Sequence, residues 1–133
     1  MPSAMKMVHE NDPAKEIWDR VKHLKGVRSL TGNQVLLGVY LRPEKTASGI
    51  FLSDVTRKED EHQGKVGLVL KLGSQAFVDS DDYKFNEEEK AKVGDWVQMW
   101  VTDGRKTQLH NQLCRVVRDF EIRMILDEPD VVY

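Results

Sequence analysis

The chain has 133 residues, of which 40% are hydrophobic and 32% are charged, a composition that is ordinary for one folded soluble domain and excludes a largely disordered chain. The 20 basic and 22 acidic residues are well mixed and leave a net charge of -2, so neither nucleic acid nor a membrane surface is expected as a partner. The longest nearly apolar run, residues 35–41, is far shorter than the roughly 20 residues that a membrane-spanning helix needs.

The N-terminus and the cysteine content both indicate the compartment. Residues 1–6 do not have the basic start and apolar stretch of a secretion signal. Cys114 is the only cysteine, so no intrachain disulfide can form. Because proteins without disulfides are typical of reducing compartments, we expect a cytoplasmic protein.

The first predicted element is a short amphipathic helix that begins at Pro13. Asp12 is a favoured N-cap residue, proline is favoured at the first helical position, and Gly26 provides a stop. Three apolar residues recur between them at helical spacing: Ile17, Val21 and Leu24. The helix either covers one end of the domain or binds a partner, and the first role is favoured because apolar stripes usually face a core.

From residue 34 the hydrophobic period changes to two, which is typical of strands. The sequence predicts one strand over 34–41 and a second over 65–72, each with one apolar side. The wetter side of the second strand is expected to carry Lys65 and Lys71. The positions predicted to share the apolar sides are Val35, Leu37, Val39 and Leu41 in the first strand, and Val66, Leu68, Leu70 and Leu72 in the second.

Three further strands are predicted downstream. One runs over 96–101 and is expected to end at a hairpin turn at Asp103-Gly104, after which the chain doubles back. The others are expected over 112–118 and 121–126. Several short strands separated by polar turns predict an all-β domain, either a sandwich or a small barrel.

Two segments do not fit the strand pattern. Residues 79–92 are mostly charged and are interpreted as a solvated excursion. Residues 42–63 contain a dense charge run, yet carry the apolar tripeptide Ile50–Leu52 after four small residues, Thr46 to Gly49. Leaving these three side chains in water costs about 1.5 to 3 kcal/mol each relative to burial. They form either a strand on the domain's own core or anchors for another protein, and these residues alone do not decide between the two.

The sequence does not contain a recognisable arrangement of catalytic or metal-binding residues. The acidic runs are typical of solvated surfaces, and Cys114 is expected to be buried in the core or half-buried, with Arg115 on the other face of its strand. We therefore expect neither an enzyme nor a bound cofactor or metal. The four histidines are scattered without the spacing of metal ligands: His9, His23, His62 and His110.

The order of these features resembles the GroES-type co-chaperonins, the small lids of barrel-shaped chaperonins. The likeness covers residues 27–126 and rests on the order and spacing of several motifs, including a Ser-Gly pair followed by an apolar tripeptide. The segments that carry it are 34–41, 44–52, 63–73, 93–97 and 121–126. The resemblance implies an irregular small β-barrel, here preceded by a short helix, with a mobile loop at 42–63 and a roof-like hairpin at 79–92.

The resemblance also implies partners and roles. The protein would form a homo-oligomer, usually a ring of seven, and cap a GroEL-type chaperonin that encloses unfolded client proteins, while the partner alone hydrolyses ATP. By the family pattern, the residues that would bind the chaperonin apical domains are Ser48, Gly49, Ile50, Phe51 and Leu52. Neighbouring subunits would pair through their first and last strands, with the contacts expected at Val27, Leu30, Ile122, Met124 and Leu126.

Both termini depart from the family pattern. Residues 1–26 form an N-terminal extension with the predicted helix, and residues 127–133 form an acidic tail. These additions indicate a divergent member of the kind that bacteriophages encode, which would act in a bacterial cytoplasm or an infected host cell. The alternative is a virion protein, associated with the capsid or tail, that keeps the same barrel without binding a chaperonin.

Overall fold

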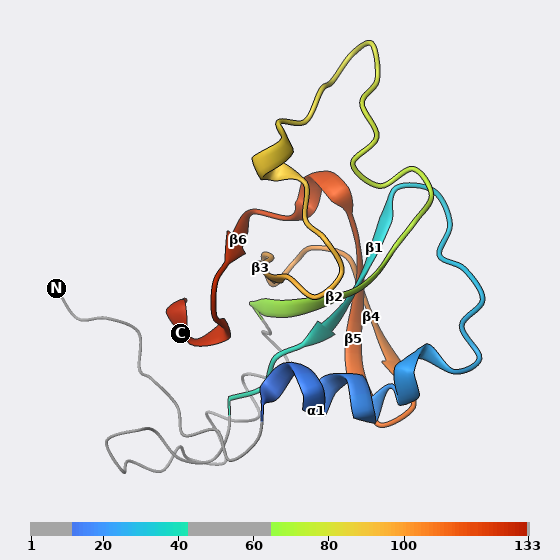
Figure 1. Ribbon diagram of the computed structural model, residues 1–133, viewed down its shortest axis with the longest axis vertical. Coiled ribbons are helices and arrows are strands. Elements are labelled where there is room, and N and C mark those ends of the chain that lie inside the picture. The colour runs from blue at the N-terminus through green and yellow to red at the C-terminus, as the bar shows by residue number, and fades with distance from the viewer. Residues whose placement is uncertain (1–11, 43–64, 133) are drawn as a thin grey trace, which may run out of the picture.

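The computed structural model describes residues 12–42 and 65–132. In these two ranges, six strands form one curved antiparallel sheet in the order β4-β5-β1-β2-β3-β6, and one α-helix lies across it (Figure 1). The all-β class with a short N-terminal helix is therefore confirmed. The elements are α1 (Pro13–Arg20), β1 (Gln34–Val39), β2 (Val66–Leu72), β3 (Trp96–Gln98), β4 (Arg105–Leu109), β5 (Gln112–Arg118) and β6 (Met124–Leu126).

Helix α1 begins as predicted and ends earlier than expected. The Asp12 carboxylate accepts a hydrogen bond from the Ala14 amide at 3.0 Å, and Pro13 occupies the first turn. The helix ends at Arg20 instead of continuing toward Gly26. The next residues form a 3₁₀ turn, Lys22–Leu24, in which all three residues have positive φ angles, and this redirects the chain.

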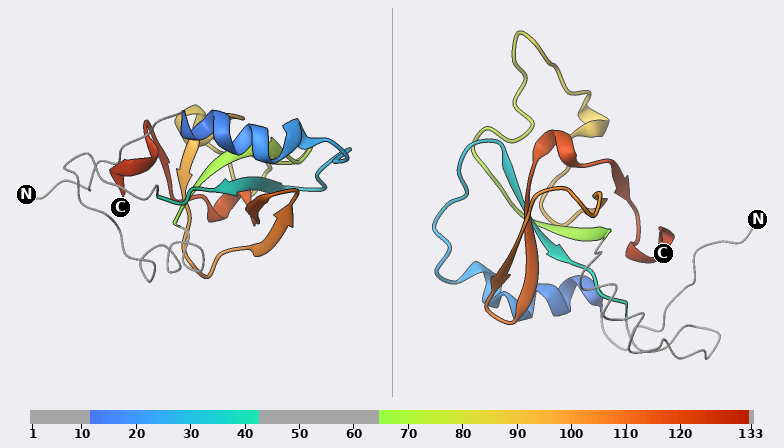
Figure 2. Two further views of the ribbon diagram at one scale, coloured as in Figure 1. Left: turned by 90° about the horizontal axis from the view of Figure 1, so that it is seen from below. Right: turned by 180° about the vertical axis from the view of Figure 1, so that it is seen from behind.

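The apolar residues form two clusters on opposite faces of the sheet. Figure 2 shows α1 lying along one of these faces. The helix-side cluster contains Ile17, Val21, Leu36, Tyr40, Val66, Leu68, Leu70, Trp96, Cys114 and Leu126. The roof-side cluster contains Val35, Leu37, Val39, Val69, Phe77, Ala91, Val97, Met99 and Val117. Strands β1 and β2 are thus buried on both faces, and the wet face predicted for β2 is wrong, because Val69 is fully buried there.

A β-bulge in β2 explains a second error. Leu36 pairs with Lys71 and Leu37 pairs with Val69, so Leu70 is the extra residue of the bulge. The bulge reverses the side that the following residues face. Leu72 therefore packs on the roof-side cluster instead of joining Leu68 on the other face, where the alternating pattern predicted it.

The strands after β2 differ from the prediction in length and pairing. β3 stops at Gln98, and the exposed Trp100 and Val101 lie beyond it. The expected hairpin at Asp103-Gly104 is wrong, because β3 pairs with β2 and β6 while β4 pairs with β5. β5 has the predicted bounds, whereas β6 begins at Met124, after a 3₁₀ turn over Asp119–Glu121.

The segment between β2 and β3 leaves the sheet and carries a small group of aromatic side chains. Phe77 contacts Phe85 edge-to-face at a centroid distance of 5.4 Å, and Phe85 contacts Tyr83 in the same way at 4.7 Å. Lys90 lies 3.1 Å from Glu87 and 3.7 Å from Asp79, and the hydrogen bond to Glu87 is the main cause of a raised Lys90 pKa. Within 12–42 and 65–132, no helix is long and apolar enough to cross a membrane.

Candidate functional site

The predicted chaperonin-binding residues Ser48, Gly49, Ile50, Phe51 and Leu52 lie outside the described residues. The structure does describe the two chain ends that flank them. The Tyr40 amide donates a 2.8 Å hydrogen bond to the Val66 carbonyl, and the Met99 amide donates one of 2.8 Å to the Lys65 carbonyl. Residues Tyr40 to Arg42 and Lys65 to Val66 are called the stem below. The chain therefore leaves the sheet just after β1 and rejoins it at the start of β2, at positions joined by the Tyr40–Val66 hydrogen bond.

The residues predicted to contact neighbouring subunits lie on two flanks. Val27 and Leu30 are half-buried in the link between α1 and β1, which contains no strand. Ile122, Met124 and Leu126 lie in or just before β6 on the opposite flank, as both Figure 1 and the rear view of Figure 2 show.

These five residues differ in how accessible they are. Leu126 belongs to the helix-side cluster. Leu30 is partly buried against the same cluster, and Ile122 is partly buried against the roof-side cluster. Met124 is 51% exposed, and its neighbour Ile125, which was not predicted, is 36% exposed. Among the strands described, β6 pairs only with β3 and so leaves one backbone edge open. The outward-facing part of this flank is thus formed by Met124 and Ile125.

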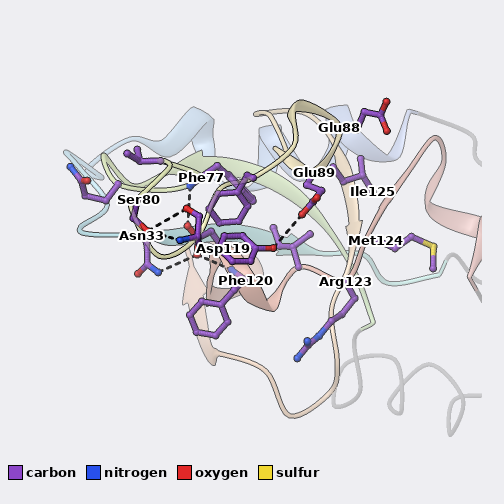
Figure 3. A pocket seen from close by; sticks show the side chains of 15 residues that line it. Asn33, Phe77, Ser80, Glu88, Glu89, Asp119, Phe120, Arg123, Met124 and Ile125 are labelled. Carbon is purple, nitrogen blue, oxygen red and sulfur yellow. Dashed lines mark hydrogen bonds between the residues drawn. The ribbon is translucent and has the colours of Figure 1, made fainter.

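A cavity of about 850 Å³ opens beside this edge (Figure 3). Its walls come from residues 75–89 on one side and 119–125 on the other. Aromatic and aliphatic side chains, among them Phe77, Tyr83 and Phe120, supply much of the lining, and the carboxylates of Glu88 and Glu89 lie at its margin. The sequence did not predict this cavity, because its two walls are far apart in the chain and no pattern in either wall indicates that they face each other.

Asp119 organises the floor of the cavity. One carboxylate oxygen accepts hydrogen bonds from the Asn33 amide group at 3.1 Å and the Phe120 backbone amide at 2.7 Å. The other accepts a 2.9 Å bond from the backbone amide of Phe77. Phe77 has a φ of +57°, an unusual conformation for a bulky residue. The carboxylate therefore joins three segments and holds a strained residue in place.

The cysteine of the described residues is not exposed for reaction. Cys114 is fully buried in the helix-side cluster, and burial raises the pKa of its thiol from 9.0 to about 11, so the predicted packing role is confirmed. Arg115 lies on the other face and donates to the carbonyls of Trp100 and Asp103. Over 12–42 and 65–132, no group of three or more His, Cys, Asp or Glu side chains is arranged to hold a metal ion.

The comparison with known proteins identifies the family. A family model described as the chaperonin 10 kDa subunit matches residues 29–126, about three quarters of the chain. The chain belongs to this family. No curated protein matches it.

The chaperonin 10 kDa subunit family accounts for the sheet but not for the two ends of the chain. The matched residues include all six strands and the segment between β1 and β2. They exclude α1 and the 3₁₀ turn Pro129–Val131. Membership supports a co-chaperonin role in general, in partnership with chaperonins of the GroEL type.

Proposed function

We propose that this protein caps a chaperonin ring through Ser48 to Leu52 and so assists the ATP-dependent folding of enclosed client proteins. The protein is not itself an enzyme in this proposal, since the chaperonin alone hydrolyses ATP. The observation that carries the proposal is the chaperonin 10 kDa subunit match, which spans residues 29–126 and includes the predicted anchor residues. The proposed compartment is the cytoplasm.

The chemistry of the anchor residues supports this mode of binding. Ile50, Phe51 and Leu52 are large apolar side chains that gain free energy when they leave water, about 1.5 to 3 kcal/mol each. They follow Ser48 and Gly49, which place few steric limits on how the chain approaches a partner groove. The described stem on either side of the anchor residues is hydrogen-bonded at the ends of β1 and β2, which supports the proposal that the anchors are presented from this end of the sheet.

The arrangement of the two flanks supports a ring, which we propose has seven subunits. The link that contains Val27 and Leu30 and the open edge of β6 lie on opposite sides of the sheet (Figure 1). Contact between two different flanks is head-to-tail, and such contacts close into a ring when the rotation between subunits allows it. A neighbour would satisfy the open edge of β6 and cover Met124 and Ile125. A ring would also let several weak loops bind one chaperonin together.

The proposal is tested with a purified bacterial GroEL-type chaperonin. We expect the protein to have the native mass of a ring and to co-elute with the chaperonin only when ADP or ATP is present. Phe51→Asp should abolish co-elution while preserving the ring mass, because losing one anchor of this kind costs about 2 kcal/mol or more per copy, which is about 30-fold in affinity.

Val93→Asp is the matched control, since Val93 is a 53% exposed apolar residue in the turn before β3 and remote in sequence from the anchors. This variant should bind as the unmodified protein does. Nucleotide-dependent binding that survives Phe51→Asp would rule out the assignment of the anchors. A monomeric native mass would rule out the ring.

A further inference from the structure

The C-terminal residues beyond the family match fold back onto the sheet. The family match ends at Leu126, and the following residues form a 3₁₀ turn, Pro129–Val131. Pro129 and Asp130 are buried, and Val132 packs against the helix-side cluster. Three of the seven residues in 127–133 are acidic, a composition typical of a solvated tail, yet the carboxylate of Asp130 is buried. Burial of an aspartate calls for a partner.

One partner of Asp130 is in the stem. The Tyr40 hydroxyl donates a 2.5 Å hydrogen bond to the Asp130 carboxylate, and both side chains are buried. The ring of Tyr40 also contacts Trp96 edge-to-face, with centroids 5.5 Å apart. Trp96 in turn pairs with Leu126 across β3 and β6. These contacts form a continuous series from Asp130 through Tyr40 and Trp96 to Leu126, and the four residues are called the tail clamp below.

The tail clamp acts on the residue that closes the stem. The amide of Tyr40 makes the 2.8 Å bond to Val66, so one residue both pairs the two chain ends and holds the tail. Hydrogen bonds at the end of a ladder open more readily than those in its middle, because they have neighbours on one side only. The hydrogen bond from the Tyr40 hydroxyl to the buried Asp130 carboxylate restrains Tyr40 and so opposes this opening.

We propose that the tail clamp positions the stem, which flanks segment 43–64, and that Tyr40 and Asp130 are positioning residues for chaperonin binding. This inference rests on the proposed function, because it assigns the tail a role in presenting the loop that carries the anchors. Holding the loop ends in place reduces the number of conformations that binding must remove. Because a ring of loops multiplies any loss per copy, a modest change at the stem has a larger effect on capping.

The first test measures hydrogen exchange in the full chain and requires no partner. Tyr40→Phe keeps the aromatic ring and removes only the hydroxyl. We expect exchange at the amides of position 40 and Met99 to become about tenfold faster, the usual effect of losing one buried hydrogen bond on a local opening equilibrium. Amides in the middle of the β1–β5 ladder should not change. Unchanged exchange at position 40, or equal acceleration throughout β5, would refute the clamp.

Two variants separate the clamp from a general effect of tyrosine removal. Tyr83→Phe removes an exposed hydroxyl that lies 3.4 Å from Glu89, and we expect it to leave exchange at the stem unchanged. Asp130→Asn keeps an oxygen that can accept the Tyr40 hydroxyl proton, so it should preserve most of the protection that Tyr40→Phe loses. Equal loss of protection in Tyr83→Phe would also refute the clamp.

The second test measures dissociation from the GroEL-type chaperonin in the presence of ADP. Tyr40→Phe should accelerate dissociation at least about threefold, Asp130→Asn should have a smaller effect, and Tyr83→Phe should have none. Faster exchange at the stem together with unchanged dissociation would refute the positioning role. If the unmodified protein bound no chaperonin, the proposed function would be wrong, and the exchange measurement would still decide whether the clamp holds the stem.

Discussion

Adding one methyl group at Gly38 tests whether α1 is an integral part of the fold. Gly38 lies in β1, beneath the helix. A Cβ atom built on this glycine would lie 2.5 Å from Cγ2 of Ile17 and 3.3 Å from Cδ1 of Leu70. Carbon atoms in good contact are about 3.5 to 4.0 Å apart, so the contact to Ile17 is too short by roughly 1 Å. Ile17 is β-branched and helical and has little rotamer freedom to move away, so α1 itself must shift.

The expected cost follows from this geometry. Overpacking of this kind destabilises a protein by about 1 to 3 kcal/mol. Replacing glycine by alanine also restricts the unfolded chain, which offsets about 0.4 to 1 kcal/mol. We therefore expect Gly38→Ala to lower the free energy of unfolding by about 1 to 2 kcal/mol, which for a chain of this size lowers Tm by roughly 3 to 8 °C.

The assay is urea unfolding at a fixed protomer concentration, followed by tryptophan fluorescence, because assembly would otherwise alter the apparent stability. Ile17→Ala removes the atom that clashes and costs about 2 to 5 kcal/mol by itself. Since the double variant no longer contains the clash, its destabilisation should be at least about 1 kcal/mol smaller than the sum of the two single effects. Additive effects, or no destabilisation by Gly38→Ala, would refute the close packing of α1 on β1.

Two further predictions concern buried polar and reactive groups. Asp119→Ala should lower the free energy of unfolding by roughly 2 to 4 kcal/mol in urea titrations, because it leaves the amides of Asn33 and Phe77 without their acceptor, and a loss under 1 kcal/mol would contradict this role. Cys114 should resist alkylation by iodoacetamide at pH 8 until the protein is unfolded. Because burial raises the pKa of the folded Cys114 thiol to about 11, the free energy of unfolding should fall as the pH rises from 9 to 11. This fall should be missing in urea titrations of Cys114→Ala, which has no thiol to ionise.

The elements that the sequence predicts well are those whose local chemistry and tertiary packing agree. Asp12 and Pro13 define the start of α1, and alternating apolar residues define β1, β2 and β5. Strand β4, Arg105–Leu109, was missed because four of its five residues are polar, and pairing with β5 alone makes it a strand. The bulge at Leu70 was missed because it depends on the partner strand, which a single-strand pattern does not contain.

The candidate site was predictable to a more limited extent. The order of motifs identified the family, which the match over 29–126 confirms. The binding roles of Ser48 to Leu52 and the subunit contacts stay predictions, and the phage origin and the virion role stay hypotheses. The buried Asp130 could not be predicted, because an acidic run is typical of a solvated tail and its partner, Tyr40, lies 90 residues away.

The helix-side face of β1 and β2 also limits which mutations such a chain can accept. Positions such as Leu36, Leu68 and Leu70 would be polar if they faced water, and α1 removes that requirement. Deleting the helix would expose all of these apolar side chains to water at once. Replacing one of them with a polar residue while the helix is present would bury a polar group without a hydrogen-bond partner. The first mutation on either route therefore destabilises the fold. The helix is therefore hard to lose once it is present, because its loss would require several compensating substitutions at the same time.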